Sequence, residues 1–213
     1  MQKRTNNVLI LTAYGSEDME TVITVDILRR AGLSVTLAGE SQIVTCSRGV
    51  KIIPDVLIDD ILEEEIFDAV VLPGGSRGVE SLAENPQVER LTRINFSRGA
   101  LICAICAAPT ILARFGLLQD LPDITITSHP SVASILRQTT SAIYTEYNVV
   151  HSGNIITSRS AGTSIEFALA IVQALEGKQK AEKTAGDIMF SGFTTTIQGF
   201  EKTDNSLPDG NDE

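Results

Sequence analysis

The chain of 213 residues carries 17 lysines and arginines against 27 aspartates and glutamates, which gives a formal net charge of −10. This acidic balance argues against nucleic acid or an anionic membrane surface as the main partner. No apolar stretch has the ~20 residues that a membrane span needs, and the polar N-terminus predicts no signal peptide. With 43% hydrophobic residues, we expect a single domain with one substantial core.

The few cysteines and histidines argue against a disulfide framework or a metal centre. The cysteines are Cys46, Cys103 and Cys106, and the histidines are His129 and His151. These residues do not have the spacing of a zinc site, so we expect no metal. The thiols are expected to be reduced, which indicates a reducing compartment. We expect the cytoplasm, and the sequence leaves mitochondrial or nuclear fractions open.

Short β-branched runs alternate with helical patterns along the chain. The expected strands are Val8–Thr12, Ser34–Ala38, Ile43–Thr45, Val50–Ile53, Asp68–Leu72, Leu101–Ile105, Ile124–Thr127 and Ile155–Thr157. The expected helices are Glu17–Ala31, Gly78 to about Phe96, Thr110–Phe115, Thr163–Leu175 and Lys178 to about Phe190. The third and fourth strands are expected to form a short antiparallel excursion. The remaining alternation predicts an α/β sandwich of three layers, a mostly parallel sheet with helices on both faces.

The last residues differ in composition from the rest of the chain. Beyond Gly192 come Thr194–Thr196 and then a stretch whose charges are mostly acidic. We therefore predict one α/β domain over residues 1–192 and a disordered acidic tail over residues 193–213.

Residues 101–110 are the most informative segment of the chain. An apolar run stops at Cys106, small residues follow, and Pro109 opens the next helix, as when a strand turns tightly into a helix. The N–H groups of a helix start favour a thiolate, so we expect a lowered pKa for Cys106. The alternative is a buried structural cysteine, and this segment alone favours neither.

Three further features follow predicted strands. They are the acidic run Glu17–Glu20, the pair Gly74–Gly75 and His129. In an open parallel sheet, ligands gather at the carboxyl ends of the strands. Because these ends meet at one edge, we expect the three features to lie near Cys106, and this convergence favours a reactive thiol.

Glu20 lies in the first turn of a predicted helix, where an acid is favoured by the helix dipole alone. It also shares a helical face with Ile23 and Ile27, so its side chain should point inward. A partly desolvated carboxyl has a raised pKa and can donate a proton to a neighbouring thiolate or alkoxide. We therefore favour a functional role over a capping role.

The other candidates each have a structural alternative. Gly74 and Gly75 could form a flexible turn, or their backbone amides could stabilise an oxyanion. Histidine is a common general acid or base, but a lone histidine such as His129 is structural at least as often as catalytic. Arg48 and Arg159 could bind a carboxylate or an oxidised thiol, or could be surface charge.

Several segments together resemble the DJ-one branch of the ThiJ/PfpI superfamily, the Parkinsonism-associated deglycase family. They are Gly15–Val22, Val25–Gly32, Cys46–Arg48, Leu72–Gly75, Ala104–Thr110 and Glu166–Ile171. The resemblance extends from about Val8 to about Phe190. It implies a flavodoxin-like sandwich that forms a homodimer and works without a cofactor.

The resemblance also implies roles for particular residues. By position, Cys106 is similar to the family's nucleophile and oxidation-sensing cysteine, and Glu20 to the protonated carboxyl bonded to it. His129 matches a nearby histidine, and Gly75 and Ala107 match the backbone donors of the oxyanion site. A second, less reactive family cysteine near the dimer interface corresponds to Cys46, a secondary site of oxidation.

Some positions depart from the family pattern. Ser76 stands where close relatives often carry Asn. The run Ser160–Gly162 replaces a Gly-Pro-Gly turn, which leaves the geometry of the Arg159 loop open. Cys103 is an added thiol, which strand alternation predicts to be buried and inert.

Two functional classes follow. The first is a glyoxalase or deglycase that acts on small dicarbonyls, methylglyoxal or glyoxal, or on glycated side chains, through addition of Cys106. The second is a redox sensor or redox-regulated chaperone, in which oxidation of Cys106 to sulfinate is the signal. A protease or glutamine amidotransferase is disfavoured, because neither His129 nor His151 begins the His-x-Glu arrangement that amidotransferases use.

Overall fold

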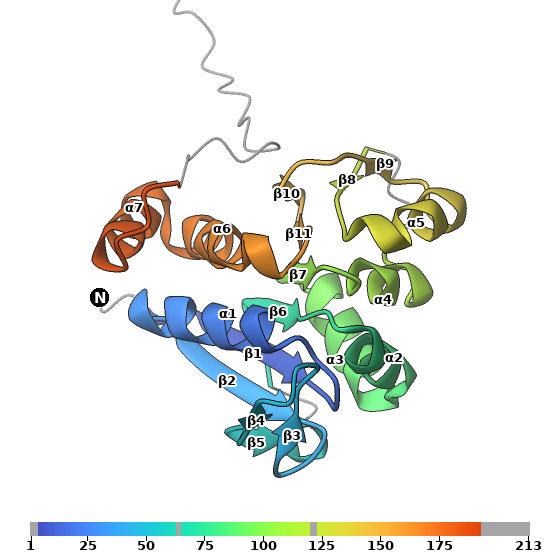
Figure 1. Cartoon of the computed structure of the whole chain (residues 1–213), viewed down its shortest axis with the longest axis horizontal. Coiled ribbons are helices and arrows are strands. Elements are labelled where there is room, and N and C mark those ends of the chain that lie inside the picture. Colours follow the sequence, from blue (N-terminus) through green and yellow to red (C-terminus); the bar gives the residue numbers. More distant parts are fainter. Residues whose placement is uncertain (1–3, 63–64, 120–122, 193–213) are drawn as a thin grey trace, which may run out of the picture.

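The computed structural model describes residues 4–62, 65–119 and 123–192 of the chain. Its centre is a seven-stranded sheet (Figure 1). In spatial order the strands are β10 (Val149–Ser152), β11 (Ile155–Ser158), β7 (Leu101–Ile105), β6 (Ala69–Leu72), β1 (Asn7–Thr12), β2 (Ser34–Gly39) and β5 (Val56–Leu57). All neighbours pair in parallel except β10 and β11, which are antiparallel. The predicted mostly parallel sheet is confirmed.

Helices cover both faces of this sheet (Figure 1). One layer contains α1 (Asp18–Arg30), α6 (Ser164–Glu176) and α7 (Lys178–Asp187). The other contains α2 (Ser76–Glu84), α3 (Pro86–Ser97) and α4 (Pro109–Arg114), and α5 (Ala133–Thr139) packs beside α4. The predicted sandwich of three layers is therefore confirmed.

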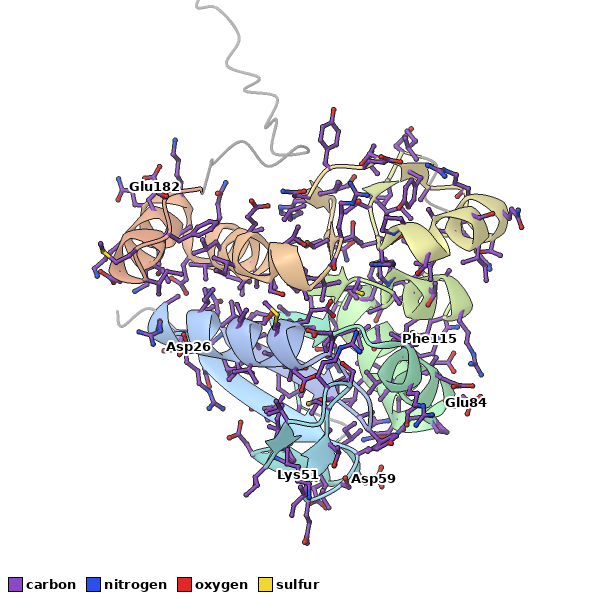
Figure 2. All side chains as sticks on the ribbon, in the orientation of Figure 1. Asp26, Lys51, Asp59, Glu84, Phe115 and Glu182 are labelled. Carbon is purple, nitrogen blue, oxygen red and sulfur yellow. The ribbon has the colours of Figure 1, made fainter. Side chains whose placement is uncertain are left out.

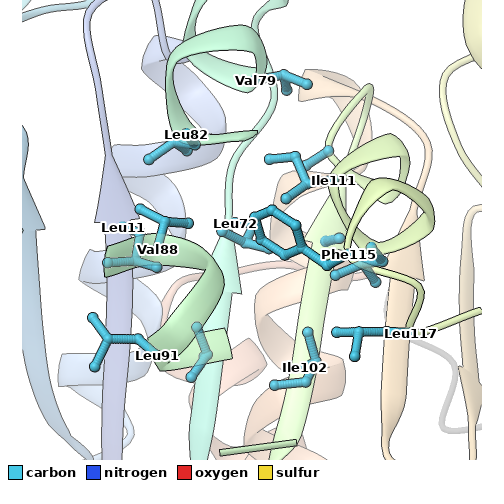
Figure 3. Close-up of a cluster of buried hydrophobic side chains, with 14 of the residues drawn as sticks. Leu11, Leu72, Val79, Leu82, Val88, Leu91, Ile102, Ile111, Phe115 and Leu117 are labelled. Carbon is cyan, nitrogen blue, oxygen red and sulfur yellow. The ribbon is translucent and has the colours of Figure 1, made fainter. Parts of the chain in front are cut away.

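Alternate side chains of the strands build two separate cores. In β1, Leu9 and Leu11 belong to the core under α2–α4, whereas Val8 and Ile10 belong to the core under α1 and α6. Figure 3 shows part of the first core, in which Phe115 and its neighbours fill the space between sheet and helices. Charged side chains such as those of Asp26, Glu84 and Glu182 lie on the outside (Figure 2). A sheet buried on both faces explains the nearly continuous apolar runs of its strands.

The predicted helix from Gly78 to about Phe96 is in fact two helices, α2 and α3. The side chain of Asn85 accepts hydrogen bonds from the N–H groups of Gln87 and Val88, which caps a new helix. Pro86 stands at its first position, where an N–H would have no helical partner. A local cap therefore interrupts an otherwise helical pattern, and α2 begins earlier than predicted, at Ser76.

The predicted strand Ile124–Thr127 does not join the main sheet. The strand that forms there is shorter, β8 (Thr125–Ile126), and it pairs in parallel with β9 (Ile143–Tyr144) as a separate two-stranded sheet. The N–H of Thr127 donates to the hydroxyl of Thr157 on β11 at 2.9 Å, so side chains rather than a backbone ladder hold it near the sheet.

The predicted antiparallel excursion is confirmed as β3 (Val44–Thr45) and β4 (Lys51–Ile52). Short 3-10 helices span Ile58–Asp60, Pro130–Val132 and Ala161–Thr163. The predicted tail, residues 193–213, lies outside the described residues. Within the described ranges, no helix combines the length and apolar character needed to cross a membrane.

Candidate active site

Cys106 lies at a strained corner between β7 and α4. Its φ of +65° is in the left-handed region, which for a residue other than glycine costs about 1–3 kcal/mol. The corner is held from two sides. The N–H of Cys106 donates to the carbonyl of Ser158 at 3.0 Å, and its carbonyl accepts from the N–H of His129 at 2.8 Å. Strain that the surrounding structure maintains in this way is typical of functional sites.

Glu20 points from the first turn of α1 toward this corner, as predicted. Its side chain is only 1% exposed, and its Oε2 accepts a hydrogen bond from the N–H of Gly74 at 2.7 Å. A Cβ added at Gly74 would lie 2.6 Å from the Cβ of Cys106 and 2.7 Å from that Oε2. Only glycine, which has no Cβ, therefore fits at position 74 between Glu20 and Cys106.

The ionisation of Glu20 is shifted by its surroundings. Burial raises its pKa from the ordinary value of 4.5 to about 7, against the lowering effect of the Gly74 hydrogen bond. The nearby charge of Glu17 contributes to this rise, and the hydrogen bond with Cys106 acts against it. At neutral pH a large fraction of this carboxyl therefore carries a proton, and it can act as an acid or a base.

The expectation of a lowered pKa for Cys106 was wrong. Burial and the charge of Glu20 raise the pKa of this thiol to about 12, although the N–H groups of Gly75 and Ala107 act to lower it. The helix start supplies these donors, but desolvation and the carboxylate outweigh them. The Glu20 carboxylate opposes ionisation of the thiol, so the two groups titrate as a pair.

A pocket of about 480 Å³ opens beside the thiol. Its lining comprises Tyr14, Gly15, Glu17, Glu20, Cys46, Ser47, Arg48, Gly75, Ser76, Arg77, Cys106, Ala107, His129, Ser131, Ser160 and Ala161. Most of the candidate residues from the sequence therefore meet here. Gly74 lies behind the lining and acts through Glu20. Arg159 lies outside the lining, and its guanidinium donates to the carbonyl of Glu146 at 2.9 Å, which supports the neighbouring loop.

The ring of His129 is oriented by Ser131. The N–H of Ser131 donates to Nδ1 of the ring at 3.2 Å, and the Ser131 hydroxyl lies 2.8 Å from the same atom. Because Nδ1 accepts an N–H, the neutral ring carries its proton on Nε2. His129 can thus offer the pocket a hydrogen-bond donor.

Asp18 has a role that the sequence did not reveal. The carboxylate accepts hydrogen bonds from the hydroxyl of Ser47 at 3.0 Å and from the N–H groups of Arg48 at 2.8 Å and Val50 at 3.1 Å. Burial acts to raise the pKa of Asp18, but these donors outweigh it and lower the pKa. Asp18 therefore fastens the loop that carries Arg48. The sequence suggested only a helix-dipole acid, because Asp18 and the loop are far apart in the chain.

The other two cysteines are buried. Cys103 is fully enclosed within β7, as predicted, and burial raises the pKa of its thiol. Cys46 is 4% exposed, and burial, with the charges of Asp18 and Glu17, raises its pKa to about 11. Neither thiol has the environment of Cys106. Among the described residues, no group of three or more His, Cys, Asp or Glu side chains is clustered so that it could hold a metal ion.

Comparisons with known proteins find relatives over most of the chain. Residues 6–174 match the model of the DJ-1/PfpI family. The Parkinson disease protein 7 homolog of Danio rerio is 41% identical over 183 residues, covering 85% of this chain and 95% of the relative. The glutathione-independent glyoxalase DJR-1.2 of Caenorhabditis elegans is 37% identical over 181 residues, covering 84% of this chain and 94% of the relative.

A solved structure shows the same architecture. The crystal structure of Drosophila melanogaster DJ-1beta superposes with a TM-score of 0.81 at 42% identity, covering 87% of this chain and 98% of that chain. Both the matched range and the identities span most of the chain, and the chain therefore belongs to the DJ-1/PfpI family.

Proposed function

We propose that the protein is a cofactor-free glyoxalase that uses Cys106 to convert methylglyoxal or glyoxal to a hydroxy acid. The observation that carries this proposal is the buried carboxyl of Glu20, with a pKa of about 7, beside the strained corner of Cys106. The nematode relative named as a glutathione-independent glyoxalase supports the same reaction.

The reaction begins when the Cys106 thiol passes its proton to the Glu20 carboxylate, and the resulting thiolate adds to the aldehyde. A C–S bond forms and the carbonyl π electrons move to oxygen, which becomes an alkoxide. The N–H groups of Gly75 and Ala107 face the sulfur and can stabilise this charge, and protonated Glu20 supplies a proton to complete the hemithioacetal. His129 can contribute a further hydrogen bond through Nε2.

An internal redox step then makes a cofactor unnecessary. The Glu20 carboxylate removes the proton from the former aldehyde carbon, and the proton is returned to the adjacent carbon through an enediol. The first carbon is thereby oxidised to a thioester while its neighbour is reduced to an alcohol. Water hydrolyses the thioester, which releases the hydroxy acid and restores the thiol. The net change is the addition of one water molecule.

Consumption of methylglyoxal, with D- and L-lactate assayed separately, tests this proposal. We expect wild type to form lactate and Cys106→Ser to form none. Cys103→Ala is the matched control, because it removes a buried thiol outside the pocket and should keep turnover. Equal lactate production by wild type and Cys106→Ser would rule out a thiol-dependent enzyme. Absence of lactate with wild type, with Cys106 shown to be reduced, would also contradict the proposal.

Early glycation adducts on protein side chains are a further candidate substrate, since they could undergo the same addition. A glycated peptide offered in buffer depleted of free dicarbonyl tests deglycation directly. Release of the unmodified side chain at a rate faster than spontaneous loss of dicarbonyl would support it. A rate equal to the spontaneous loss would show that any deglycation is indirect.

The second candidate function is a redox sensor or redox-regulated chaperone. The half-buried sulfur lies in an open pocket and faces three donors, the N–H groups of Gly75 and Ala107 and the protonated carboxyl of Glu20. Hydrogen peroxide would transfer oxygen to the thiolate stepwise, each peroxide leaving as water, and these donors suit sulfinate oxygens. Mass spectrometry after mild peroxide should find oxidation on Cys106 before Cys46, and the reverse order would contradict this function.

The homodimer implied by the family resemblance stays a prediction, as does a cytoplasmic location. Large apolar side chains are exposed on α1 and around the β3–β4 excursion, including Met19, Val22, Ile43 and Ile53. Exposed apolar side chains, where they form a contiguous patch, are typical of a protein interface. Light scattering of the purified chain would determine its oligomeric state, and a monomer at micromolar concentration would contradict the dimer.

A further inference from the structure

The pocket beside Cys106 is larger than a small dicarbonyl requires. Its volume of about 480 Å³ lies in the range of roughly 300–1,000 Å³ that is typical for sites of drug-sized ligands. Methylglyoxal at the thiol would leave most of this space unfilled. The chemistry of the rest of the pocket therefore indicates what else a substrate could carry.

Arg77 lines this pocket from the first turn of α2. The partial positive charge of a helix N-terminus disfavours a cation there, and this first turn contains no acid. The side chain of Arg77 is nevertheless held in place by its neighbours. The guanidinium donates to the hydroxyl of Tyr14 at 3.3 Å and lies 5.9 Å from the centre of its ring, and a Cβ at Gly15 would lie 2.7 Å from the Cβ of Arg77. Helix stability does not explain this arginine.

Arg48 lines the same pocket from the loop that Asp18 fastens. The N–H of Arg48 itself donates to Asp18 at 2.8 Å, and Ser47 and Val50 donate on either side of it. The backbone beneath this guanidinium is therefore anchored, although the side chain is exposed. Two guanidinium groups, each from a fixed backbone, thus share one pocket.

The acids of the pocket do not neutralise these arginines. Neither Arg48 nor Arg77 forms an ion pair with an acid within the described ranges. Glu17 uses its carboxylate to cap α1, accepting from the N–H of Glu20 at 2.8 Å. Glu20 is buried and bonded to Gly74. The guanidinium groups of Arg48 and Arg77 therefore line the pocket without a carboxylate partner among the described side chains and can bind a carboxylate of the ligand.

We propose that Arg77, assisted by Arg48, selects 2-oxoaldehydes that carry a carboxylate at the end remote from the aldehyde. A guanidinium binds a carboxylate through paired hydrogen bonds, and that contact would orient the aldehyde at Cys106. This inference rests on the proposed glyoxalase function and specifies its substrate class. Arg77 is then a specificity-determining residue that does not touch the reacting carbons.

The first test compares a charged substrate with its neutral ester, which has the same dioxo carbon chain. The probes are 4,5-dioxopentanoate and its methyl ester, measured as kcat/KM with wild type and Arg77→Gln. We expect wild type to prefer the acid by about tenfold or more, mainly through KM, as for one charge-assisted hydrogen bond. Arg77→Gln should reduce this preference toward unity, and Arg77→Lys should restore part of it. Arg93→Gln is the control, because this exposed arginine on α3 pairs with Glu89 away from the pocket.

A second readout does not depend on turnover. Levulinate has the same carboxylate and ketone but no aldehyde, so it can occupy the pocket without reacting. It should protect Cys106 from alkylation by iodoacetamide in wild type, whereas methyl levulinate and the Arg77→Gln variant should show little protection.

The outcomes separate this inference from the proposed function. Turnover of methylglyoxal with equal rates for acid and ester, or a preference that survives Arg77→Gln, would overturn the role of Arg77 and leave the glyoxalase intact. If no dicarbonyl is converted, the glyoxalase fails, and levulinate protection decides the anion site independently. Equal protection by levulinate and its methyl ester would then overturn the anion site.

Discussion

Cys103 and Cys106 belong to the same short stretch of chain but have opposite environments. Cys103 lies inside β7, pairs in register with Ile156 and Val71, and is fully buried. Cys106 lies just beyond the strand, with a φ of +65°, a carboxyl partner in Glu20 and an open pocket. Both residues are cysteines, so their different chemistry comes from their surroundings: the corner after β7, the Glu20 carboxyl and the open pocket.

Replacing the ionisable carboxyl of Glu20 should have the largest effect on the chemistry that distinguishes Cys106 from Cys103. We expect Glu20→Gln to lower kcat/KM for methylglyoxal by about 10²–10⁴-fold, because an amide can act neither as the acid nor as the base. The fold should remain intact, since the amide has nearly the same shape. Alkylation kinetics of Cys106 and lactate formation measure the effect. Unchanged thiol reactivity and turnover would refute the role of Glu20.

The pH dependence of stability should sharpen the comparison, because it isolates the carboxyl that Cys106 has and Cys103 lacks. The pKa of Glu20 is raised from 4.5 to about 7 in the folded state, so the folded protein binds more protons than the unfolded chain between these values. The free energy of unfolding should therefore fall as pH rises from about 4.5 to 7, by about 3 kcal/mol at most.

Urea unfolding at several pH values measures this decline. Glu20→Gln is the matched variant, since it keeps the shape and removes the titrating group. The difference in stability between wild type and variant should change with pH over this window and level off above it. A difference that is independent of pH would contradict the raised pKa.

The third cysteine extends the comparison with a smaller expected effect. Cys46 is buried and directly precedes the loop that Asp18 holds through Ser47, Arg48 and Val50. Asp18→Asn removes charge-assisted hydrogen bonds, so the loop should open more often and alkylation of Cys46 should rise about tenfold. Peptide mass mapping after timed labelling measures this rate.

Asp26→Asn is the control for that experiment. Asp26 lies on the same helix, but it is exposed and pairs with Arg30 one turn away. Losing such a surface pair should change stability by less than about 1 kcal/mol and leave Cys46 labelling as in wild type. Equal labelling of Cys46 in wild type and Asp18→Asn would show that the loop is held by other contacts.

Much of the fold could be predicted from the sequence, because it depends on patterns between near neighbours. The alternation of β-branched runs and helical faces predicted the three layers. The spacing of Glu20 from Ile23 and Ile27 predicted its inward side chain, and Pro109 marked the helix after Cys106. The interruption at Asn85 was missed, because a capping side chain can end one helix and begin another within a continuous pattern.

The site was predicted only in part. The sequence by itself determined which groups follow strand ends, and hence that Glu20, Gly75 and His129 would gather near Cys106. Only the tertiary structure decided that the thiol pKa is raised, that Asp18 fastens a distant loop, and that Arg77 lines the pocket. Burial, charge and hydrogen bonding act between groups that are close in space but remote in the chain. The sequence gives the identities of these groups, whereas the energies of burial and of charge interactions depend on distances that only the folded structure determines.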